Sequence, residues 1–328
     1  MNAWLSLEPA VRWTLIGVFA TLVVATATVR LLQRTKQHHD WTELSARVKS
    51  WWIMAAVFTF AVVVNRNISI LFFAFVSFLS LKEYLSLIPT RRADRRVLFW
   101  AYLCIPIQFL MVYLEWYGMF IIFIPVFAFL LLPMRMITIG QTDGFLRAVG
   151  TLHWGLMTMV YSLSHAAFLL ILKLRDEPER FPGPGLVIFL VVLTQMNDVL
   201  QFLWGKSIGK RKIVPSVSPG KTWGGFLGGV GTTIVVASIL GPFLTPMNVW
   251  QSLIAGVIIG LGGFVGDVSI SALKRDLHIK DSGSLLPGHG GILDRVDSLT
   301  YTAPLFFHYI YYLFPWHTFG TAGPKLPW

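Results

Sequence analysis

Acidic side chains gather in the stretch 266–298, and their types and spacing suit the chemistry of phosphate groups. Asp294 and Asp297 are three residues apart, which places two carboxylates on one face of a helical turn. Asp267 lies near the start of the same stretch. Divalent cations such as Mg²⁺ bind carboxylate oxygens together with the phosphate oxygens of a substrate. If the loop between them folds back, these aspartates are predicted to hold a metal ion, although acids that begin a helix are also ordinary partners of its dipole.

Basic groups and a glycine-rich turn in the same stretch favour a phosphate ligand. His289 lies between Gly288 and Gly290, and glycines allow a ligand to approach the backbone closely. A histidine can hydrogen-bond a phosphate or transfer a proton near neutral pH, whereas a lone loop histidine is more often polar surface. The basic residues expected to bind phosphate oxygens are Lys274, Arg275, Lys280 and Arg295.

A second phosphate-binding segment is predicted at 205–222, which contains lysine and arginine residues and no acid. It ends in Ser218, Pro219, Gly220, Lys221 and Thr222. Hydroxyl groups, a positive charge and backbone N–H groups at a helix start can hold a phosphate. The spacing GxxxxGK[ST] of a P-loop is absent. The basic residues here are also expected from the preference of cytoplasmic loops for Lys and Arg.

Two polar residues, Asn197 and Asp198, lie inside the apolar segment 184–204. An ionisable group at such a place costs a few kcal/mol on insertion and by default indicates function. Asp267 lies similarly near the end of the apolar segment 250–273. We expect Asn197 and Asp198 to contribute to substrate binding, and the alternative for each carboxylate is a structural pair with a neighbouring lysine or serine.

The elements that must position these residues are apolar segments of membrane-spanning length. The chain has 328 residues, of which 55% are hydrophobic and 13% charged, and its mean hydropathy is +0.65. Ten apolar segments can be drawn: 13–32, 51–64, 68–88, 97–114, 117–133, 151–172, 184–204, 224–246, 250–273 and 298–315. They predict an all-α, polytopic transmembrane helical bundle of about 9–10 helices.

Three features of the apolar segments refine this prediction. The segments 51–64 and 68–88 are interrupted at Asn65, and a re-entrant pair is the alternative to two spanning helices. The first segment lacks a basic region and a cleavage site, so we expect a retained helix rather than a cleaved signal peptide. The single cysteine, Cys104, excludes a disulfide within the chain.

Basic residues predict the orientation of the bundle. Lys and Arg gather in every second connection, from 33–50 onwards, and the net charge is +11. Cytoplasmic loops of membrane proteins carry this excess of positive charge. We therefore expect both termini outside and the catalytic loops on the cytoplasmic face. Segments before residue 180 are bulky and aromatic, and those after it are rich in glycine. This contrast predicts an N-terminal scaffold half, 1–180, and a C-terminal catalytic half, 181–328, within one membrane domain.

The stretch 266–298 resembles the signature of the CDP-diacylglycerol synthases (phosphatidate cytidylyltransferases). That signature reads S-x-x-K-R-x(4)-K-D, then P-G-H-G-G, then D-R-x-D, and it begins here at Ser271 and ends at Asp297. Upstream, the resemblance covers Asn197-Asp198, Gly205-Lys206 and residues 218–222, and the patch 81–84 is similar too. The chain departs from the family at Val199 to Phe202, where a small residue and an aromatic are usual, and at Gly224, where a polar residue is usual.

The resemblance implies transfer of CMP from CTP to phosphatidate, with Mg²⁺ and release of pyrophosphate, for phospholipid synthesis. Asp267, Asp294 and Asp297 would hold the metal, and Lys221, Lys274 and Arg275 would hold phosphates. Ser218 and Thr222 would add hydrogen bonds, and His289 would orient the leaving pyrophosphate. Asp198 would act near the metal or recognise cytosine. These roles need no strong general base, because the attacking phosphate oxygen is already ionised.

Partners implied by the resemblance are CTP, phosphatidate or a related lipid phosphate, and the lipid bilayer of the cell (inner) membrane, with no nucleic acid. A monovalent cation beside Mg²⁺ and a homodimer are left open. The alternative functions are a CTP-dependent lipid kinase of the polyprenol type, a cytidylyltransferase for another lipid phosphate, and a non-catalytic membrane paralogue. The departures at 199–202 and Gly224 bear on substrate preference and efficiency.

Overall fold

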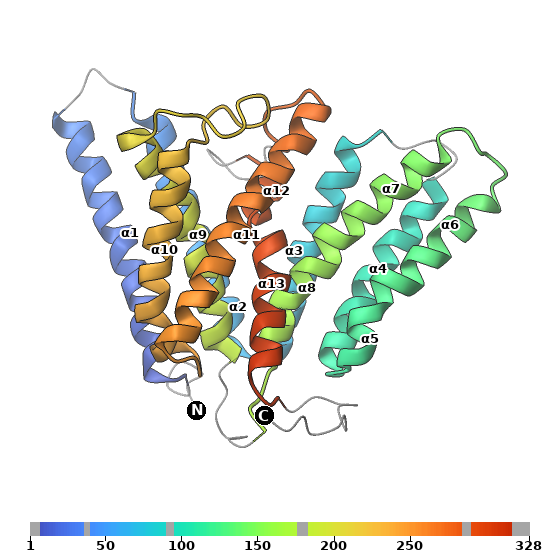
Figure 1. The fold of residues 1–328 in the computed structure, drawn as a ribbon, viewed down its shortest axis with the longest axis horizontal. Helices are drawn as coiled ribbons and strands as arrows, with labels where there is room; N and C mark the ends of the chain where they lie inside the picture. Colours follow the sequence, from blue (N-terminus) through green and yellow to red (C-terminus); the bar gives the residue numbers. More distant parts are fainter. Residues whose placement is uncertain (1–6, 36–39, 90–94, 176–182, 284–289, 317–328) are drawn as a thin grey trace.

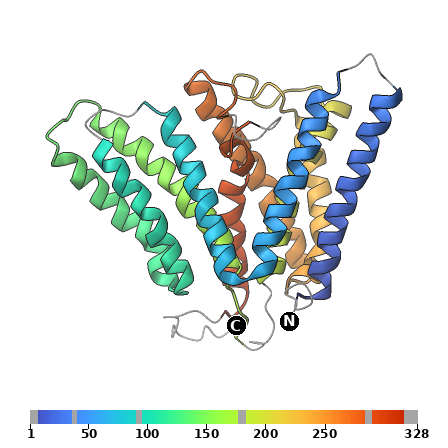
Figure 2. The ribbon, with the colours of Figure 1, turned by 180° about the vertical axis from the view of Figure 1, so that it is seen from behind.

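The apolar segments fold as long helices, because lipid offers the backbone N–H and C=O groups no other hydrogen-bond partners. A computed structural model describes residues 7–35, 40–89, 95–175, 183–283 and 290–316. The four helices of its first third are α1 (Pro9–Thr35), α2 (Thr42–Val64), α3 (Arg66–Leu87) and α4 (Arg95–Tyr113). Together with the helices that follow in the chain, these four confirm the predicted all-α helical bundle (Figures 1 and 2).

Two helical stretches in the middle of the chain are assembled from shorter pieces. The first runs through α5 (Tyr117–Ile122), the π-helix η2 (Phe123–Ala128) and α6 (Phe129–Ile137). The second runs through α7 (Phe145–Gly155), the π-helix η3 (Leu156–Ser162) and α8 (Leu163–Leu169). Pi-helical turns interrupt α-helices as local bulges, so each stretch still forms one continuous rod.

The last third of the chain supplies the helices that surround the predicted site. They are α9 (Gly183–Ile208), α10 (Trp223–Leu244), α11 (Val249–Asp276), α12 (Leu293–Val296) and α13 (Leu299–Leu313). Among the described residues, eight helical spans are long and apolar enough to cross a membrane. The two predicted segments outside these eight are 151–172, which contains η3, and 298–315, whose helix α13 has 15 residues.

The alternative of a re-entrant pair at 51–64 and 68–88 is not what the structure shows. Helices α2 and α3 have 23 and 22 residues and both qualify as membrane spans. The break between them is a helix cap, since the Asn65 side chain accepts a hydrogen bond from the Ile68 N–H at 2.9 Å. The two helices meet at this break and diverge from it toward the opposite side of the bundle (Figure 2).

Helix direction brings the predicted loops to one face of the molecule. Helices α1, α3, α6, α9 and α11 all run upward in Figure 1 and end toward its upper side, and α12 lies in the upper half of the molecule. The segment 209–222 and the turn 290–298 therefore share a face with the C-terminal ends of α9 and α11. The alternation of basic and non-basic connections predicted this common face.

Close packing of α9, α10 and α11 depends on glycine at particular points. A Cβ atom added at Gly225 on α10 would lie 2.6 Å from the Gln201 carbonyl oxygen on α9. A Cβ atom at Gly266 on α11 would lie 2.5 Å from the Asp297 carbonyl oxygen. Small residues let membrane helices approach closely. The second contact is the one that draws the turn before α13 against α11.

Candidate functional site

Lys221 and Asp267 form an ion pair between the segment 209–222 and helix α11. Their side chains are 17% and 23% exposed, so the pair is largely screened from water. Lys221 Nζ also donates to Gln201 Oε1 on α9, at 3.2 Å. Burial alone would lower the pKa of the Lys221 ammonium, but Asp267 and Asp198 together raise it above its usual value. Lys221 is therefore held fully protonated.

Backbone hydrogen bonds fix the segment that carries Lys221. The Ile213 N–H donates to the Lys221 carbonyl at 3.2 Å, and the Trp223 N–H donates to the Arg211 carbonyl at 3.0 Å. The Lys221 N–H donates in turn to the Ser218 carbonyl at 3.1 Å. Thr222 caps α10, because its hydroxyl oxygen accepts from the Gly225 N–H at 3.1 Å. The predicted residues Ser218, Lys221 and Thr222 thus lie in one rigid turn.

Asp294 has a set of hydrogen-bond donors of its own. Its Oδ1 accepts from Lys274 Nζ at 2.7 Å, and the two side chains are 8% and 17% exposed. Its Oδ2 accepts from the Ser282 N–H at 3.1 Å, the Ser282 hydroxyl at 2.9 Å and the Gly291 N–H at 3.2 Å. Burial opposes ionisation, but Lys274 and Ser282 outweigh it and lower the pKa of Asp294 below its usual value. Asp294 thus ties the end of α11 to the turn before α12.

Asp297 lies in a different environment from Asp294. Its Oδ1 accepts from the Ser298 N–H at 2.7 Å. Burial, followed by repulsion from Asp267 and Asp198, raises the pKa of Asp297 well above its usual value. Ser298 links this carboxylate to the next one, since its hydroxyl donates to Asp198 Oδ1 at 3.0 Å. Three carboxylates from α9, α11 and the turn before α13 therefore face the same region.

Asn197 is placed to join helices. Its side chain is fully buried, its Nδ2 donates to the Gly260 carbonyl at 3.3 Å, and its Oδ1 accepts from the Thr233 hydroxyl at 3.1 Å. Both ends of the amide are thus engaged between α9, α10 and α11. The neighbouring residue, Asp198, is the one that faces the carboxylates.

The other predicted residues take separate positions. Arg275 Nε donates to the Val217 carbonyl at 3.1 Å and so joins α11 to the segment 209–222. Lys280 is exposed. Arg295 influences Asp198 and Asp297 through its positive charge, and its Nε is buried without a hydrogen-bond partner in the described structure. His289 lies outside the described residues, as does the segment 284–289.

Four residues of the site were not assigned roles in the sequence prediction. Gln201 accepts from Lys221, Ser282 donates to Asp294, and Ser298 donates to Asp198. Glu83 on α3 accepts from the N–H groups of Ile292 and Leu293. Glu83 carries a sequence signal, since it is an acid inside an apolar segment. The other three are hydroxyl or amide residues of common types, so only the fold reveals their contacts.

The predicted three-aspartate metal centre can be compared with these contacts. In the part of the chain that the structure describes, no group of three His, Cys, Asp or Glu side chains is arranged to hold a metal ion. Asp294 accepts four hydrogen bonds through its two oxygens, whereas each oxygen of Asp267 has one partner among the described residues, Lys221 or the Ser271 hydroxyl at 3.4 Å. Asp267 and Asp297 remain close enough to repel each other. Mg²⁺ is commonly held by one or two carboxylates with substrate phosphates and water, so these two aspartates fit such an ion.

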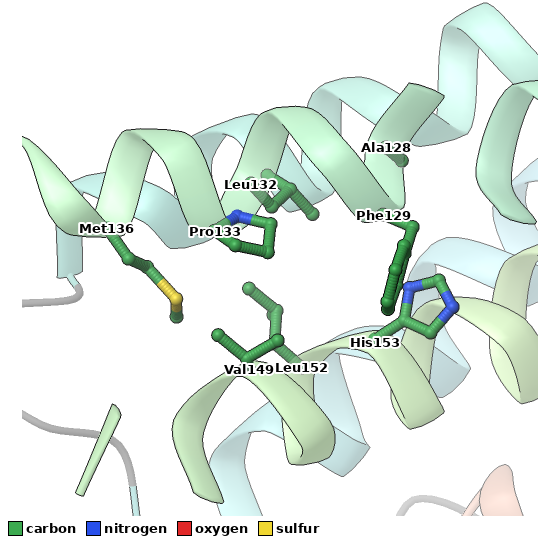
Figure 3. A pocket seen from close by; sticks show the side chains of 8 residues that line it. All are labelled: Ala128, Phe129, Leu132, Pro133, Met136, Val149, Leu152 and His153. Atoms are coloured by element: carbon green, nitrogen blue, oxygen red, sulfur yellow. The ribbon is translucent and has the colours of Figure 1, made fainter. Parts of the chain in front are cut away.

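A pocket elsewhere in the molecule lies between α6 and α7, among the N-terminal helices (Figure 3). Its lining is apolar apart from His153, whose ring packs against Phe129 with ring centroids 4.7 Å apart. No carboxylate lines the pocket. The pocket therefore offers no phosphate chemistry.

Comparison with known proteins agrees with the geometry. The model of the cytidylyltransferase family matches residues 45–313. An uncharacterized protein of Escherichia coli, YnbB, is 44% identical over 299 residues, which cover 91% of this chain and 98% of that protein. Phosphatidate cytidylyltransferases are similar over shorter regions: that of Staphylococcus epidermidis is 35% identical over 45% of this chain, and that of Haemophilus influenzae is 40% identical over 43%.

These alignments span about half the length of the phosphatidate cytidylyltransferases, 58% and 52% respectively. The family model, in contrast, covers every helix from α3 to α13. Its match includes both segments predicted to bind phosphate, together with Asp198, Asp267 and Asp297. The chain therefore belongs to the cytidylyltransferase family and is a nucleotidyltransferase built as a multi-pass membrane protein.

Proposed function

We propose that the protein transfers the CMP group of CTP to a lipid phosphate, with phosphatidate as the first candidate, and releases pyrophosphate. A phosphate oxygen of the lipid forms a bond to the α-phosphorus of CTP, and the bond from that phosphorus to the bridging oxygen breaks. The observation that supports this most is the meeting of Lys221, Asp267 and Asp297 at one end of the helices that frame the site. Cations and carboxylates of this kind are what phosphoryl chemistry requires.

The basic residues would position the two anionic substrates. Lys221 is protonated and fixed by Gln201 and Asp267, so its ammonium can bind a phosphate oxygen without losing side-chain freedom. Arg275 lies on the same face, where the segment 209–222 meets α11. Arg295 adds a positive charge beside Asp198 and Asp297. These groups would neutralise charge that otherwise keeps the two phosphates apart.

The acidic residues would serve a metal ion. Three carboxylates face two cations here, so one negative charge is in excess. The carboxylates are Asp198, Asp267 and Asp297, and the cations are Lys221 and Arg295. Mg²⁺ would be held by Asp267 and Asp297, and when bound it would screen the phosphate charges during attack. Asp294 would keep Lys274 and the turn in place. This division differs from the three-ligand prediction and explains why Asp294 is surrounded by donors.

The proposed orientation puts this site at the cytoplasmic surface of the membrane. Helix ends that carry basic residues share the face on which the site lies (Figure 1). Positive loops are retained in the cytoplasm, where CTP is made available. Apolar side chains around the site, including Phe202, Trp223 and Leu227, are exposed and suit contact with lipid. A lipid phosphate could therefore reach Lys221 from the bilayer.

Product analysis tests this proposal. Purified protein is incubated with Mg²⁺, a panel of lipid phosphates, and CTP labelled in either the α- or the γ-phosphate. Cytidylyl transfer predicts α-label in the lipid and release of pyrophosphate. Transfer of γ-label with release of CDP would contradict it and favour a CTP-dependent lipid kinase. The panel also tests the identity of the lipid, because the residues 199–202 depart from the usual family pattern.

A further inference from the structure

Glu83 lies on α3, in the half of the chain that was predicted to be a scaffold, yet its carboxylate contacts the turn that leads to Asp294 and Asp297. Glu83 Oε2 accepts a hydrogen bond from the Ile292 N–H at 2.9 Å. Glu83 Oε1 accepts one from the Leu293 N–H at 3.1 Å. Hydrogen bonds from N–H groups to a carboxylate are roughly twice as strong as neutral ones. The contact therefore joins two distant parts of the chain firmly.

Two glycines shape the space around this carboxylate. A Cβ atom added at Gly291 would overlap Glu83 Oε1. A Cβ atom added at Gly283 would lie 3.2 Å from Glu83 Cδ and Oε2. A side chain at either position would thus displace the carboxylate or the turn. The backbone approaches Glu83 as closely as it does only because both positions are glycine.

The same turn is held a second time by Asp294. The Gly291 N–H donates to Asp294, while the next two N–H groups donate to Glu83. Three successive N–H groups are thereby divided between two carboxylates. The N–H groups at the start of a helix have no partners within it, so these two acids decide how the turn is oriented.

We propose that Glu83 is a positioning residue for nucleotidyl transfer. By accepting the Ile292 and Leu293 N–H groups, it sets the orientation of the turn and of α12, and so places Arg295 and Asp297 toward Lys221 and Asp267. This inference rests on the proposed function. It gives α3 a part in catalysis without any contact with the substrates. A displacement of about 1 Å in such a group can cost a hundredfold in rate.

A purely structural role for Glu83 has a different kinetic signature. If Glu83 only stabilised the fold, its loss would lower the fraction of active molecules, and the remaining molecules would keep their KM for CTP and their dependence on Mg²⁺. If Glu83 positions the turn, the molecules stay folded and their substrate and metal dependence change. The two roles can therefore be separated by measurements on one variant.

The test uses Glu83→Gln in the full-length protein. Glutamine has the same shape, but its NH₂ group cannot accept, so one of the two N–H groups of the turn loses its partner. Two controls match it. Lys82→Gln changes the exposed neighbour on the same helix. Glu115→Gln changes a partly buried carboxylate on the connection between α4 and α5, which forms an ion pair with Arg66 of α3.

For Glu83→Gln we expect kcat to fall by about ten- to a hundredfold, as for other displaced catalytic groups. The KM for CTP or the Mg²⁺ concentration for half-maximal activity should rise at least about threefold. For both controls, kcat, the KM for CTP and the Mg²⁺ concentration for half-maximal activity should stay within about twofold of the parent protein. Amide hydrogen exchange should become faster in residues 290–297 and stay unchanged in α10 and α13. Glu83→Asp, which keeps the charge, should recover part of the activity.

The positioning role would be overturned if only kcat fell, while the KM for CTP, the Mg²⁺ dependence and the amide hydrogen exchange of residues 290–297 stayed as in the parent protein. If Glu83→Gln cannot be purified folded, Gly283→Ala takes its place, because its methyl group meets the same carboxylate from the other side, and the same outcomes apply. The exchange measurement does not need turnover. If the parent protein shows no activity with CTP and any lipid phosphate, the proposed function fails, while exchange still decides whether Glu83 holds the turn.

Discussion

Asp294 and Asp297 are three residues apart, but their surroundings have opposite character. Asp294 receives four hydrogen bonds, from Lys274, Ser282 and Gly291, and its pKa is lowered. Asp297 is buried and faces other carboxylates, and burial followed by this repulsion raises its pKa. The first arrangement stabilises the fold, whereas the second opposes it through repulsion between like charges. Repulsion of this kind is typical of functional sites, so we assign chemistry to Asp297 and organisation to Asp294.

The largest effect is expected from Asp297→Asn, with Asp267→Asn as its partner variant. Removing either charge should lower CTP-dependent turnover by about a thousandfold, similar to the loss of a group that stabilises a transition state. For Asp297→Asn the thermal unfolding temperature should stay the same or rise, because repulsion is relieved, whereas Asp267→Asn should lower it, because Lys221 loses its ion-pair partner. Turnover and thermal unfolding in detergent are the two measurements. Turnover within about tenfold of the parent protein would break the assignment of chemistry to this pair.

Lys221→Met should have the next largest effect, a loss of about a hundredfold in kcat/KM, because one phosphate-binding cation is removed. Stability should also fall, since Asp267 then lacks the ammonium that neutralises it. Lys212→Met is the matched control, because this residue lies on the same segment and is exposed. Equal effects of the two substitutions would show that Lys221 acts only through the general positive charge of the loop.

Asp294→Asn tests the contrast between Asp294 and Asp297 directly. Turnover should fall by about tenfold, because the turn is loosened but the residues proposed to bind Mg²⁺ remain. The free energy of unfolding should fall by about 1–3 kcal/mol, since Lys274 is left without its charged partner. Asp294→Asn and Asp297→Asn are thus expected to change stability in opposite directions. A stability gain for Asp294→Asn, measured by thermal unfolding, would reverse the roles.

The smallest effect is expected from Gln201→Leu. Gln201 is buried and supplies one hydrogen bond to Lys221, so its loss should reduce kcat/KM by about three- to tenfold, as expected for one bond to a charged group. Steady-state kinetics with CTP as the varied substrate measures the change. Gln195→Leu on the same helix serves as control, because its hydrogen bond to the Arg295 carbonyl is long, 3.5 Å. A larger loss for the control would contradict the role of Gln201.

The helices could be predicted from the sequence because the bilayer leaves few alternatives. Apolar length located ten helical stretches, and the alternation of basic loops predicted that the segments 205–222 and 266–298 share a face. The meeting of Lys221 with Asp267 follows from that topology. Physical constraints act strongly at this level, since every backbone polar group in lipid needs an internal partner.

The finer arrangement could not be predicted, for two physical reasons. The spacing of Asp294 and Asp297 indicated a shared helical face, and Asp297 and Ser298 do keep helical backbone angles between α12 and α13. Spacing does not show, however, that Lys274 and Ser282 lie beside Asp294 while other carboxylates lie beside Asp297. The contact of Glu83 with Ile292 joins positions 209 residues apart. No periodicity or local motif reports such a pairing, which depends on how α3 packs against the turn.

The role of Asp297 in cytidylyl transfer is tested by the fate of α-labelled CTP with the parent protein and with Asp297→Asn, each supplied with Mg²⁺ and phosphatidate. We expect the parent protein to place the label in lipid and to release an equal amount of pyrophosphate. Asp297→Asn, though folded, should do so about a thousandfold more slowly. Label that stays in CDP while the γ-phosphate enters lipid, or an Asp297→Asn protein as active as its parent, would contradict this role.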